Sequence, residues 1–341
     1  MQTIQLKAPY LIFVGNETSD HFAKTGAGIV EWRRSLCKGQ MNLKGGTVDL
    51  GLPSMTIKEA AEANVGSLII GTASIGGGIP DTWMDTLVEA LLEGIDIVAG
   101  VHTRLKDIPR LREAADQSGA RLVDVRIPPE NLPVGTGRKR AGKRLLTVGT
   151  DCGSGKKYTA LALEKDMKER GMNVDFRASG QTGIMIAGKG IPIDSVVVDF
   201  ISGAAELLSP ENDPEHWDII EGQGSIFHPG YAAVSMGLLM GSQPDAFIVC
   251  HEANGKFMVG WDHYVLPTIQ EVIARTIQIG KLTNKEIRCI GVSVNTSQLT
   301  PEERENYLDN LSKQIKLPCV DPLKSGTQKL IDYLNTTFNN K

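Results

Sequence analysis

Short apolar runs alternate with amphipathic stretches between residues 10 and 125. Tyr10–Gly15 (YLIFVG) and Ser67–Gly71 (SLIIG) are continuous apolar runs with the length of a buried strand. Between Asp81 and Glu93, apolar side chains recur at the spacing of one helix face. The other elements predicted in this part are helices at Asp20–Arg34, Met55–Ala63 and Ile108–Ser118 and strands at Ile95–Ala99 and Arg121–Val125. Strands that alternate with helices predict a parallel sheet covered on both faces.

The alternation stops at a stretch rich in proline and glycine and then resumes. We interpret Pro128–Gly142 as a linker because these residues break both helical and strand patterns. After it, the predicted strands are Leu145–Val148, Asn173–Arg177, Val196–Phe200, Ala246–Cys250 and Arg288–Val294, and the predicted helices are Lys156–Arg170, Ser202–Leu208, Thr268–Ile279 and Pro301–Ile315. Because 341 residues suffice for two cores, we predict two α/β domains at 1–130 and 144–341, joined by a linker at 131–143.

The first strand of the second domain leads into a glycine-rich turn that carries a lysine. The segment reads LLTVGTDCGSGK, and its strand, turn and helix start are the context of a phosphate-binding P-loop. Glycines allow backbone N–H groups to converge on a phosphate, and the helix N-terminus and the lysine supply positive charge. We therefore assign ligand binding to Gly149, Thr150, Asp151, Cys152, Gly153, Ser154, Gly155, Lys156 and Lys157. The alternative is a glycine-rich turn that binds nothing.

Two features depart from the pattern G-x-x-x-x-G-K-[ST]. The interval from Gly149 to Gly155 is one residue longer than the pattern requires. Lys157 also stands where the pattern has the hydroxyl that holds Mg²⁺. Thr159 lies two positions further along the helix, which turns its side chain about 200° around the axis.

Polar side chains follow the predicted strands of the second domain, where open α/β sheets bind their ligands. These strand ends carry Asp151–Lys157, Ser179–Thr182, Glu221–Ser225, His251–Asn254 and Asn295–Thr296. Among them, Gln181, Thr182 and Gly183 are candidate hydrogen-bond donors to a ligand, although a turn satisfied by its own backbone is the alternative. Asn295 could read a base or a pantetheine amide, or it could cap its own loop.

Acidic and basic side chains near this crevice are candidates for proton transfer and substrate binding. Glu221 follows the apolar run DII, where P-loop proteins place a second acid, and His228 follows it closely in the chain. We assign catalysis to Glu221 and His228, because a histidine or carboxylate can serve as general base. A surface acid in a turn is the alternative for Glu221, and an ordinary hydrogen-bonded histidine is the alternative for His228 and His251. We assign substrate binding to Arg33, Arg177, Gln223 and His251; a solvated helix end is the alternative for Arg33. The glycine-rich loop at 72–80 and His102 are further candidates in the first domain.

Composition limits the possible partners. The formal net charge of −4 and the lack of a long basic run argue against nucleic acid. We interpret the local basic cluster at 138–144 as a solvated part of the linker. The five cysteines form no C-x-x-C motif or Cys/His cluster, so we predict no metal site and no disulfide framework. The N-terminal residues lack the features of a signal peptide, and no apolar run reaches 18 residues; we therefore expect a cytoplasmic protein without a membrane partner.

The motifs GTDCGSGK, ASGQTG and IEGQGS resemble those of the dethiobiotin synthetase-like branch of P-loop proteins. The longer strings GQTGIMIAGKGIP and EGQGSIFHPGYAAVSMGLLMGSQPDAFIVCH extend the similarity over nearly the whole chain, to a two-domain bacterial family. That resemblance implies an N-terminal Rossmann-like parallel-sheet domain and a C-terminal P-loop NTPase-like α/β domain.

Some members of that family are D-glutamate N-acetyltransferases that act beside an enolase-superfamily enzyme in D-glutamate breakdown. The resemblance implies acetyl-CoA as donor, a small-molecule substrate and N-acetyl-D-glutamate as product. Lys157 departs from the synthetase pattern, which has threonine there, and this favours a P-loop that only holds the phosphates of a cofactor. The alternative is an ATP- and Mg²⁺-dependent ligase or kinase. We also expect a homo-oligomer, which is the common state of soluble enzymes.

Overall fold

The computed structural model describes residues 4–19, 22–72, 78–101 and 103–338. They form two compact units, an N-terminal unit of Gln2–Glu130 with Gly180–Ser195 and a C-terminal unit of Asn131–Ser179 with Val196–Lys341. The segment 180–195 therefore leaves the second half of the sequence and packs with the first, which the linear division at 131–143 does not anticipate. His102 and most of the predicted loop at 72–80 lie outside the described residues.

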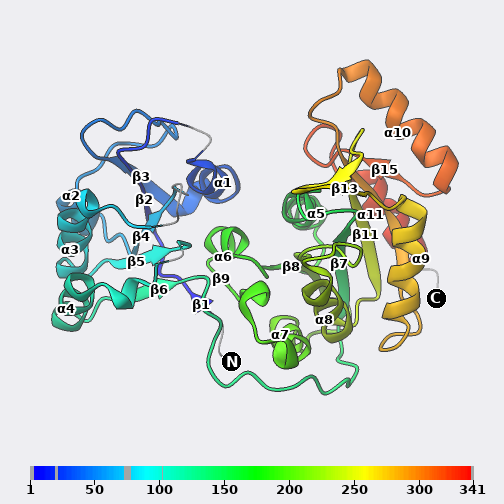
Figure 1. The fold of residues 1–341 in the computed structure, drawn as a ribbon, viewed down its shortest axis with the longest axis horizontal. Coiled ribbons are helices and arrows are strands. Elements are labelled where there is room, and N and C mark those ends of the chain that lie inside the picture. The colour runs from blue at the N-terminus through cyan, green and yellow to red at the C-terminus, as the bar shows by residue number, and fades with distance from the viewer. Residues whose placement is uncertain (1–3, 20–21, 73–77, 102, 339–341) are drawn as a thin grey trace. The chain divides into compact units, whose positions relative to one another are not determined.

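A parallel five-stranded sheet in the order β3-β2-β4-β5-β6 forms the centre of the N-terminal unit. Its strands are β2 (Tyr10–Gly15), β3 (Cys37–Asn42), β4 (Ser67–Ile70), β5 (Asp96–Ala99) and β6 (Leu122–Asp124), and its helices are α1 (Lys24–Arg33), α2 (Ile57–Glu62), α3 (Met84–Leu92), α4 (Pro109–Ser118) and α6 (Gln181–Ala187). Helices α2 to α4 cover one face, and α1 and α6 cover the other (Figure 1). The predicted doubly covered parallel sheet is confirmed.

The return of the chain at 180–195 is fixed by pairing as well as by packing. Strand β1 (Ile4–Gln5) pairs antiparallel with β9 (Lys189–Gly190), and α6 packs against α1. Gly188 ends α6 in the left-handed conformation, and a Cβ there would lie 2.8 Å from the Tyr10 hydroxyl. Only glycine fits this close approach with that backbone conformation.

The C-terminal unit contains a parallel six-stranded sheet in the order β15-β14-β11-β7-β10-β8. Its strands are β7 (Lys143–Gly149), β8 (Val174–Arg177), β10 (Trp217–Ile220), β11 (Ala246–Glu252), β14 (Arg288–Asn295) and β15 (Cys319–Val320), and its helices are α5 (Lys156–Glu169), α7 (Ile201–Leu208), α8 (Ala232–Ser242), α9 (Ile269–Gly280), α10 (Pro301–Ile315) and α11 (Gln328–Phe338). Helices α5 and α11 pack on one face, and α8 and α9 on the other (Figure 1). After β10 the chain crosses from one side of β7 to the other, so the crevice at the carboxyl end of β7 is a topological switch point.

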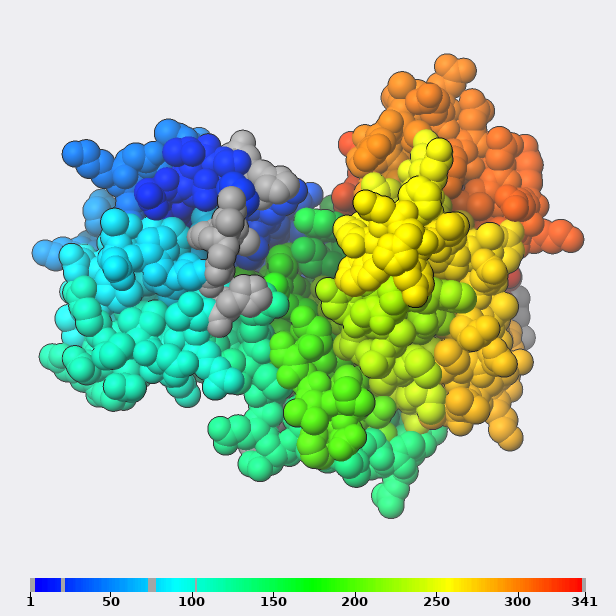
Figure 2. Space-filling model, in the orientation of Figure 1, coloured from blue at the N-terminus to red at the C-terminus, as the bar shows by residue number. Residues whose placement is uncertain are grey.

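Local sequence signals set several helix starts in this unit. Thr268 and Glu271 form a capping box at α9, and Thr300 and Glu303 form another at α10. A small antiparallel hairpin of β12 (Phe257–Met258) and β13 (Trp261–Val265) follows β11 and lies on the surface of the unit (Figure 2). Among the described residues, no helix combines the length and apolar character that a bilayer crossing requires.

Two expectations from the sequence are wrong, and one strand was not predicted. The strand predicted at Val196–Phe200 is a 3-10 helix at Val198–Phe200; Val197 and Val198 are exposed, so their apolar character does not indicate a buried strand. The strand that was not predicted is the edge strand β3, whose Gln40 side chain donates to Val48 O and accepts from Leu50 N.

The second wrong expectation is that the basic cluster at 138–144 is solvated: Arg138 and Lys139 are exposed, but the arginines further along are held by the fold. Arg144 is fully buried and donates to five backbone carbonyls, among them those of Ser209 and Pro210. Arg140 donates to Ser209 and Gly241, and burial next to Arg144 lowers its pKa to about 10.

Candidate phosphate-binding site

Lys156, the first residue of α5, is buried beneath the turn that precedes it. Its Nζ donates to the carbonyl oxygens of Asp151 (2.6 Å) and Cys152 (2.8 Å) and lies 3.4 Å from Ser154 Oγ. Burial lowers the pKa of Lys156, and the acidic neighbours Asp151 and Glu221 act in the opposite direction. A buried ammonium held only by loop oxygens is the arrangement expected of a P-loop lysine.

Glycines make room for the lysine and for a ligand above it. A Cβ at Gly222 would lie 1.6 Å from the Thr147 carbonyl oxygen and 3.1 Å from Lys156 Cδ. A Cβ at Gly149 would lie 3.1 Å from Lys156 Nζ. By contrast, a Cβ at Gly153 or Gly155 would meet no atom of the described residues within 4 Å. The loop is therefore closed around the lysine and open on its outer side, where an anion could bind.

The first turn of α5 presents no hydroxyl to a metal ion from its second position. Lys157 stands there, with its ammonium 4.6 Å from the centre of the Tyr158 ring. Thr159 directs its hydroxyl into the core, where it donates to Gly155 O (3.1 Å) and lies 2.7 Å from Ser293 Oγ. The side chains that surround Lys156 therefore fit a phosphate group alone better than the Mg²⁺-bound nucleotide of an NTPase.

Glu221 follows β10 and is 4% exposed. One carboxylate oxygen accepts a hydrogen bond from the backbone N–H of Ser179 (3.0 Å), at the carboxyl end of the neighbouring strand β8. Gln223 donates to the Ser179 hydroxyl (2.9 Å). Glu221 and Gln223, both predicted site residues, are therefore hydrogen-bonded to the same serine. Backbone N–H of Gly222 donates to the Thr147 hydroxyl (2.9 Å), which fixes the turn after β10 against β7.

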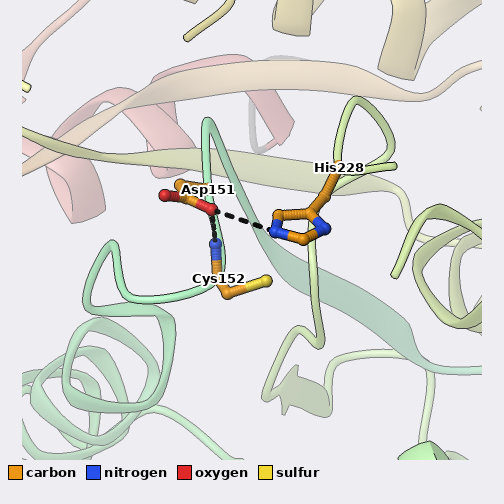
Figure 3. Close-up of side chains that lie close together, drawn as sticks. All are labelled: Asp151, Cys152 and His228. Carbon is orange, nitrogen blue, oxygen red and sulfur yellow. Dashed lines mark hydrogen bonds and ion pairs between the residues drawn. The ribbon is translucent and has the colours of Figure 1, made fainter. Parts of the chain in front are cut away.

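Asp151, Cys152 and His228 come together beside the loop, and one ligand-type atom from each lies within 4.8 Å of the others. Figure 3 shows the Asp151 carboxylate and the Cys152 sulfur facing the same edge of the His228 ring. His228 Nε2 lies 3.9 Å from Asp151 Oδ1. The sequence analysis found no such cluster, because His228 is distant in sequence and no regular spacing connects it to the loop.

The remaining predicted side chains of this unit have local partners. His251 Nδ1 lies 3.1 Å from the Thr150 hydroxyl, and burial lowers the His251 pKa, so the neutral ring is favoured. Asn295 Oδ1 accepts from Ser297 N (3.1 Å), which is the loop cap considered as its alternative. Arg177 forms an ion pair with Asp218 (2.7 Å) and lies 3.5 Å from Asp175. These carboxylates already compensate its charge, so we no longer assign a substrate carboxylate to Arg177.

Other predicted residues lie in the N-terminal unit. Gln181, Thr182 and Gly183 form the start of α6. Gln181 lies between Arg126 Nη1 (3.1 Å) and Gly100 O (2.7 Å) when its amide is oriented to satisfy both. Arg33 ends α1 and donates to Trp32 O (2.9 Å).

The hairpin β12–β13 contributes to the site, and the sequence analysis missed it. Backbone N–H of Val259 donates to Asp151 Oδ2 (2.8 Å), and the Trp261 ring lies edge-on to His228 with ring centres 4.5 Å apart. The available signal was the pair of β-prone runs FMV and WDHYV on either side of Gly260, whose φ of +84° suits a tight turn.

Comparison with known proteins identifies the family. Residues 133–331 match the family described as "Domain of unknown function (DUF1611_C) P-loop domain". Residues 41–128 match "Domain of unknown function (DUF1611_N) Rossmann-like domain". The chain belongs to the DUF1611 family. The predicted Rossmann-like and P-loop domains are confirmed by these matches, as is the predicted family.

DUF1611 relatives cover nearly the whole chain. A protein of Pseudoalteromonas sp. named D-glutamate N-acetyltransferase is 45% identical over 328 residues, which are 96% of this chain and 99% of that protein. A protein of Tritonibacter scottomollicae with the same name is 44% identical over 96% of this chain and 99% of its own length. A crystal structure of a DUF1611 protein from Anabaena variabilis is 31% identical with a TM-score of 0.83, and covers 97% of this chain and 100% of that one.

Proposed function

We propose that this protein transfers the acetyl group of acetyl-CoA to the amine of D-glutamate. Two curated relatives that carry the name D-glutamate N-acetyltransferase, at 45% and 44% identity over 96% of the chain, support this activity. The observation that supports phosphate binding by the loop is the buried Lys156 beneath an open glycine-rich turn. We place the reaction in D-glutamate breakdown, in the cytoplasm, and in a homo-oligomer.

The loop would hold the phosphates of acetyl-CoA through Lys156 and the backbone N–H groups of 153–157. Gly153 and Gly155 leave their outer sides open, and Gly155, in the left-handed conformation, starts α5 without a side-chain cap. The helix N-terminus therefore adds partial positive charge to that of the lysine. Acetyl-CoA supplies the activated acyl group, and the role of the loop is to bind and orient it.

The amine of D-glutamate must lose a proton before it can attack a thioester, so a general base is required. We assign this role to Glu221. Its buried carboxylate accepts a hydrogen bond from Ser179 N, and it lies near enough to Lys156 to raise the pKa of the lysine. This assignment requires the acyl end of the donor to fold back towards the loop. Glu221→Gln should then lower kcat without changing the affinity for CoA; a change in CoA affinity alone would place Glu221 on the phosphate side.

The activity is tested by mass spectrometry of D- and L-glutamate incubated separately with acetyl-CoA or with Mg²⁺-ATP. We expect N-acetyl-D-glutamate from acetyl-CoA and D-glutamate. Release of ADP from ATP, without any need for acetyl-CoA, would instead support a ligase or kinase. Lys156→Ala should weaken CoA binding, and unchanged KM and kcat would remove the loop from the mechanism. Size-exclusion chromatography with light scattering tests the homo-oligomer.

A further inference from the structure

His228 is fixed in one orientation by its surroundings. It lies between β10 and α8 and is 1% exposed. The Tyr231 ring lies 4.6 Å from it at a tilt of 30°, and the Trp261 ring packs on it at 83°. A buried imidazole packed against two aromatic rings cannot turn to exchange its nitrogens without displacing one of them.

A backbone hydrogen bond determines which nitrogen of this ring carries the proton. His228 Nδ1 accepts from the backbone N–H of Gly230 at 3.1 Å. An accepting nitrogen has a free lone pair, so the proton of the neutral ring is on Nε2. The Nε2–H group is therefore a hydrogen-bond donor with a fixed direction.

That donor has no hydrogen-bond partner among the residues that the structure describes. Asp151 Oδ1 is 3.9 Å away, which exceeds hydrogen-bond distance. The two oxygens of Asp151 already accept from Cys152 N (2.6 Å) and Val259 N (2.8 Å). Buried donors are almost always satisfied in folded proteins, so an unsatisfied one beside a binding loop requires an acceptor from outside the protein, either an ordered water or a ligand oxygen.

The same protonation disfavours two other uses of this cluster. A metal ion bound by Asp151, Cys152 and His228 would need a lone pair on Nε2, where the proton resides. A thiol activated by His228 would need the same lone pair to accept its proton. Burial also raises the pKa of the Cys152 thiol, which disfavours the thiolate that either use requires.

We propose that His228 donates its Nε2–H to an anionic oxygen of the group that Lys156 holds over the loop, and that it does not act as a general base. Asp151 and Cys152 connect the two residues, because their carbonyl oxygens accept from Lys156 Nζ and their side chains face the His228 ring. The inference rests on the proposed function, in which this oxygen belongs to a phosphate of acetyl-CoA. It replaces the role of base that the sequence suggested for His228.

The test compares two substitutions that separate donation from proton transfer. Glutamine can place an amide N–H near the position of Nε2 but cannot accept a proton, and leucine can do neither. We expect His228→Leu to weaken binding of CoA and of inorganic pyrophosphate about tenfold, as the loss of one hydrogen bond to a charged group predicts. His228→Gln should keep both affinities within roughly threefold of the original protein. His263→Gln, on the exposed strand β13, is the control and should change neither.

A base would give the opposite pattern, with turnover lost in both variants and CoA affinity kept in both. That result would overturn the inference. Nitrogen NMR of the ring provides an independent measurement on the unaltered protein: we expect the proton on Nε2, and a proton on Nδ1 or stoichiometric Zn²⁺ binding abolished by His228→Gln would contradict it. If leucine unfolds the protein, the NMR measurement and the glutamine variant still decide.

Failure of the proposed function would be recognisable separately. Pyrophosphate binding needs no acetyl transfer, so a protein that fails to acetylate D-glutamate can still lose pyrophosphate affinity in His228→Leu. Conversely, the protein could be an active acetyltransferase whose affinities for pyrophosphate and CoA do not change in His228→Leu. That result would support the proposed function and overturn this inference.

Discussion

The two ends of the six-stranded sheet both bury charged side chains, but they compensate the charge in different ways. Towards the amino end, Asp218 is 1% exposed and accepts from Arg177 Nε (2.7 Å) and His216 Nε2 (3.1 Å). Arg144, also 1% exposed, has its guanidinium surrounded by backbone carbonyls. Asp218 and Arg144 therefore both have fixed partners within the fold.

At the carboxyl end, backbone atoms hold the charged side chains beside a glycine-rich loop. Lys156 is held by two loop carbonyls, Asp151 accepts from two backbone N–H groups, and the His228 Nε2–H has no partner among the described residues. Charge paired within the fold stabilises it, whereas charge held by a loop with open space above it can be shared with a ligand. Burial alone therefore does not separate structural from candidate functional charges; open space beside the charged group, as at Gly153 and Gly155, does.

The largest effect is expected at the amino end. Asp218→Ala removes the shared partner of Arg177 and His216, and the loss of one member of a buried pair costs about 3–5 kcal/mol of unfolding free energy. Urea unfolding measures it. Asp175→Ala is the control, because that carboxylate is 40% exposed and 3.5 Å from Arg177, and it should cost less than about 1 kcal/mol. Equal losses in the two variants would contradict the compensation described above.

At the carboxyl end, we expect binding to change more than stability. Lys156→Met removes a charge-assisted contact to the ligand, and the affinity for CoA should fall by about 3 kcal/mol, roughly a hundredfold. The unfolding free energy should stay constant or rise, because the buried ammonium is replaced by an apolar chain of similar length. Lys165→Met, an exposed position on the same helix, is the control for both measurements. A large loss of stability with intact affinity would make Lys156 a structural charge.

The sequence was sufficient for what depends on local pattern. The apolar run of β2, the turn before Lys156 and the capping residues of α10 each carry their signal within a few positions. These signals placed the parallel strands and the loop correctly. The strand pairing that brings Glu221 beside Ser179 also follows, because the ends of parallel strands meet at one edge of a sheet.

What depends on contacts between distant segments was not predictable in this way. The segment 180–195 reads as a glycine-rich loop of the second domain, yet its pairing with β1 and packing on α1 place it in the N-terminal unit. His228 looked like a free base, because only the structure brings Gly230 N to its Nδ1 and Trp261 to its ring. Arg177 looked available for a substrate, because its partner Asp218 is on another strand.

A smaller effect is expected where the loop is closed around the lysine. Gly222→Ala would place a Cβ 1.6 Å from Thr147 O and near Lys156 Cδ, so the turn after β10 must move away from β7. We expect a loss of about 2 kcal/mol of unfolding free energy together with weaker CoA binding, since one contact involves the lysine. Gly28→Ala in α1 is the matched control: the nearest atom would be 3.8 Å away, and alanine favours helix. Weakened binding in both variants would point to a general effect of added methyl groups.

The smallest expected effect is a pair of pH dependences with opposite signs. Burial lowers the pKa of Lys156, so its ammonium loses its proton at a lower pH than a surface lysine does. Anion binding requires the charged form, and the affinity for CoA should therefore fall a few-fold, or about 1 kcal/mol, as the pH rises towards the ordinary pKa of a lysine.

The stability of the free protein should change in the other direction over the same range. Because the unfolded chain binds the proton of Lys156 more strongly than the folded protein does, the unfolding free energy contributed by this group rises with pH through the folded pKa. The dependence of CoA affinity on pH and the dependence of stability on pH should both be weaker in Lys156→Met. The same variant corrects for the titration of CoA itself. Calorimetry in two buffers should detect the uptake of a proton when CoA binds to the unaltered protein. Slopes that are unchanged in this variant would mean that another group titrates, and that the loop lysine keeps its charge throughout.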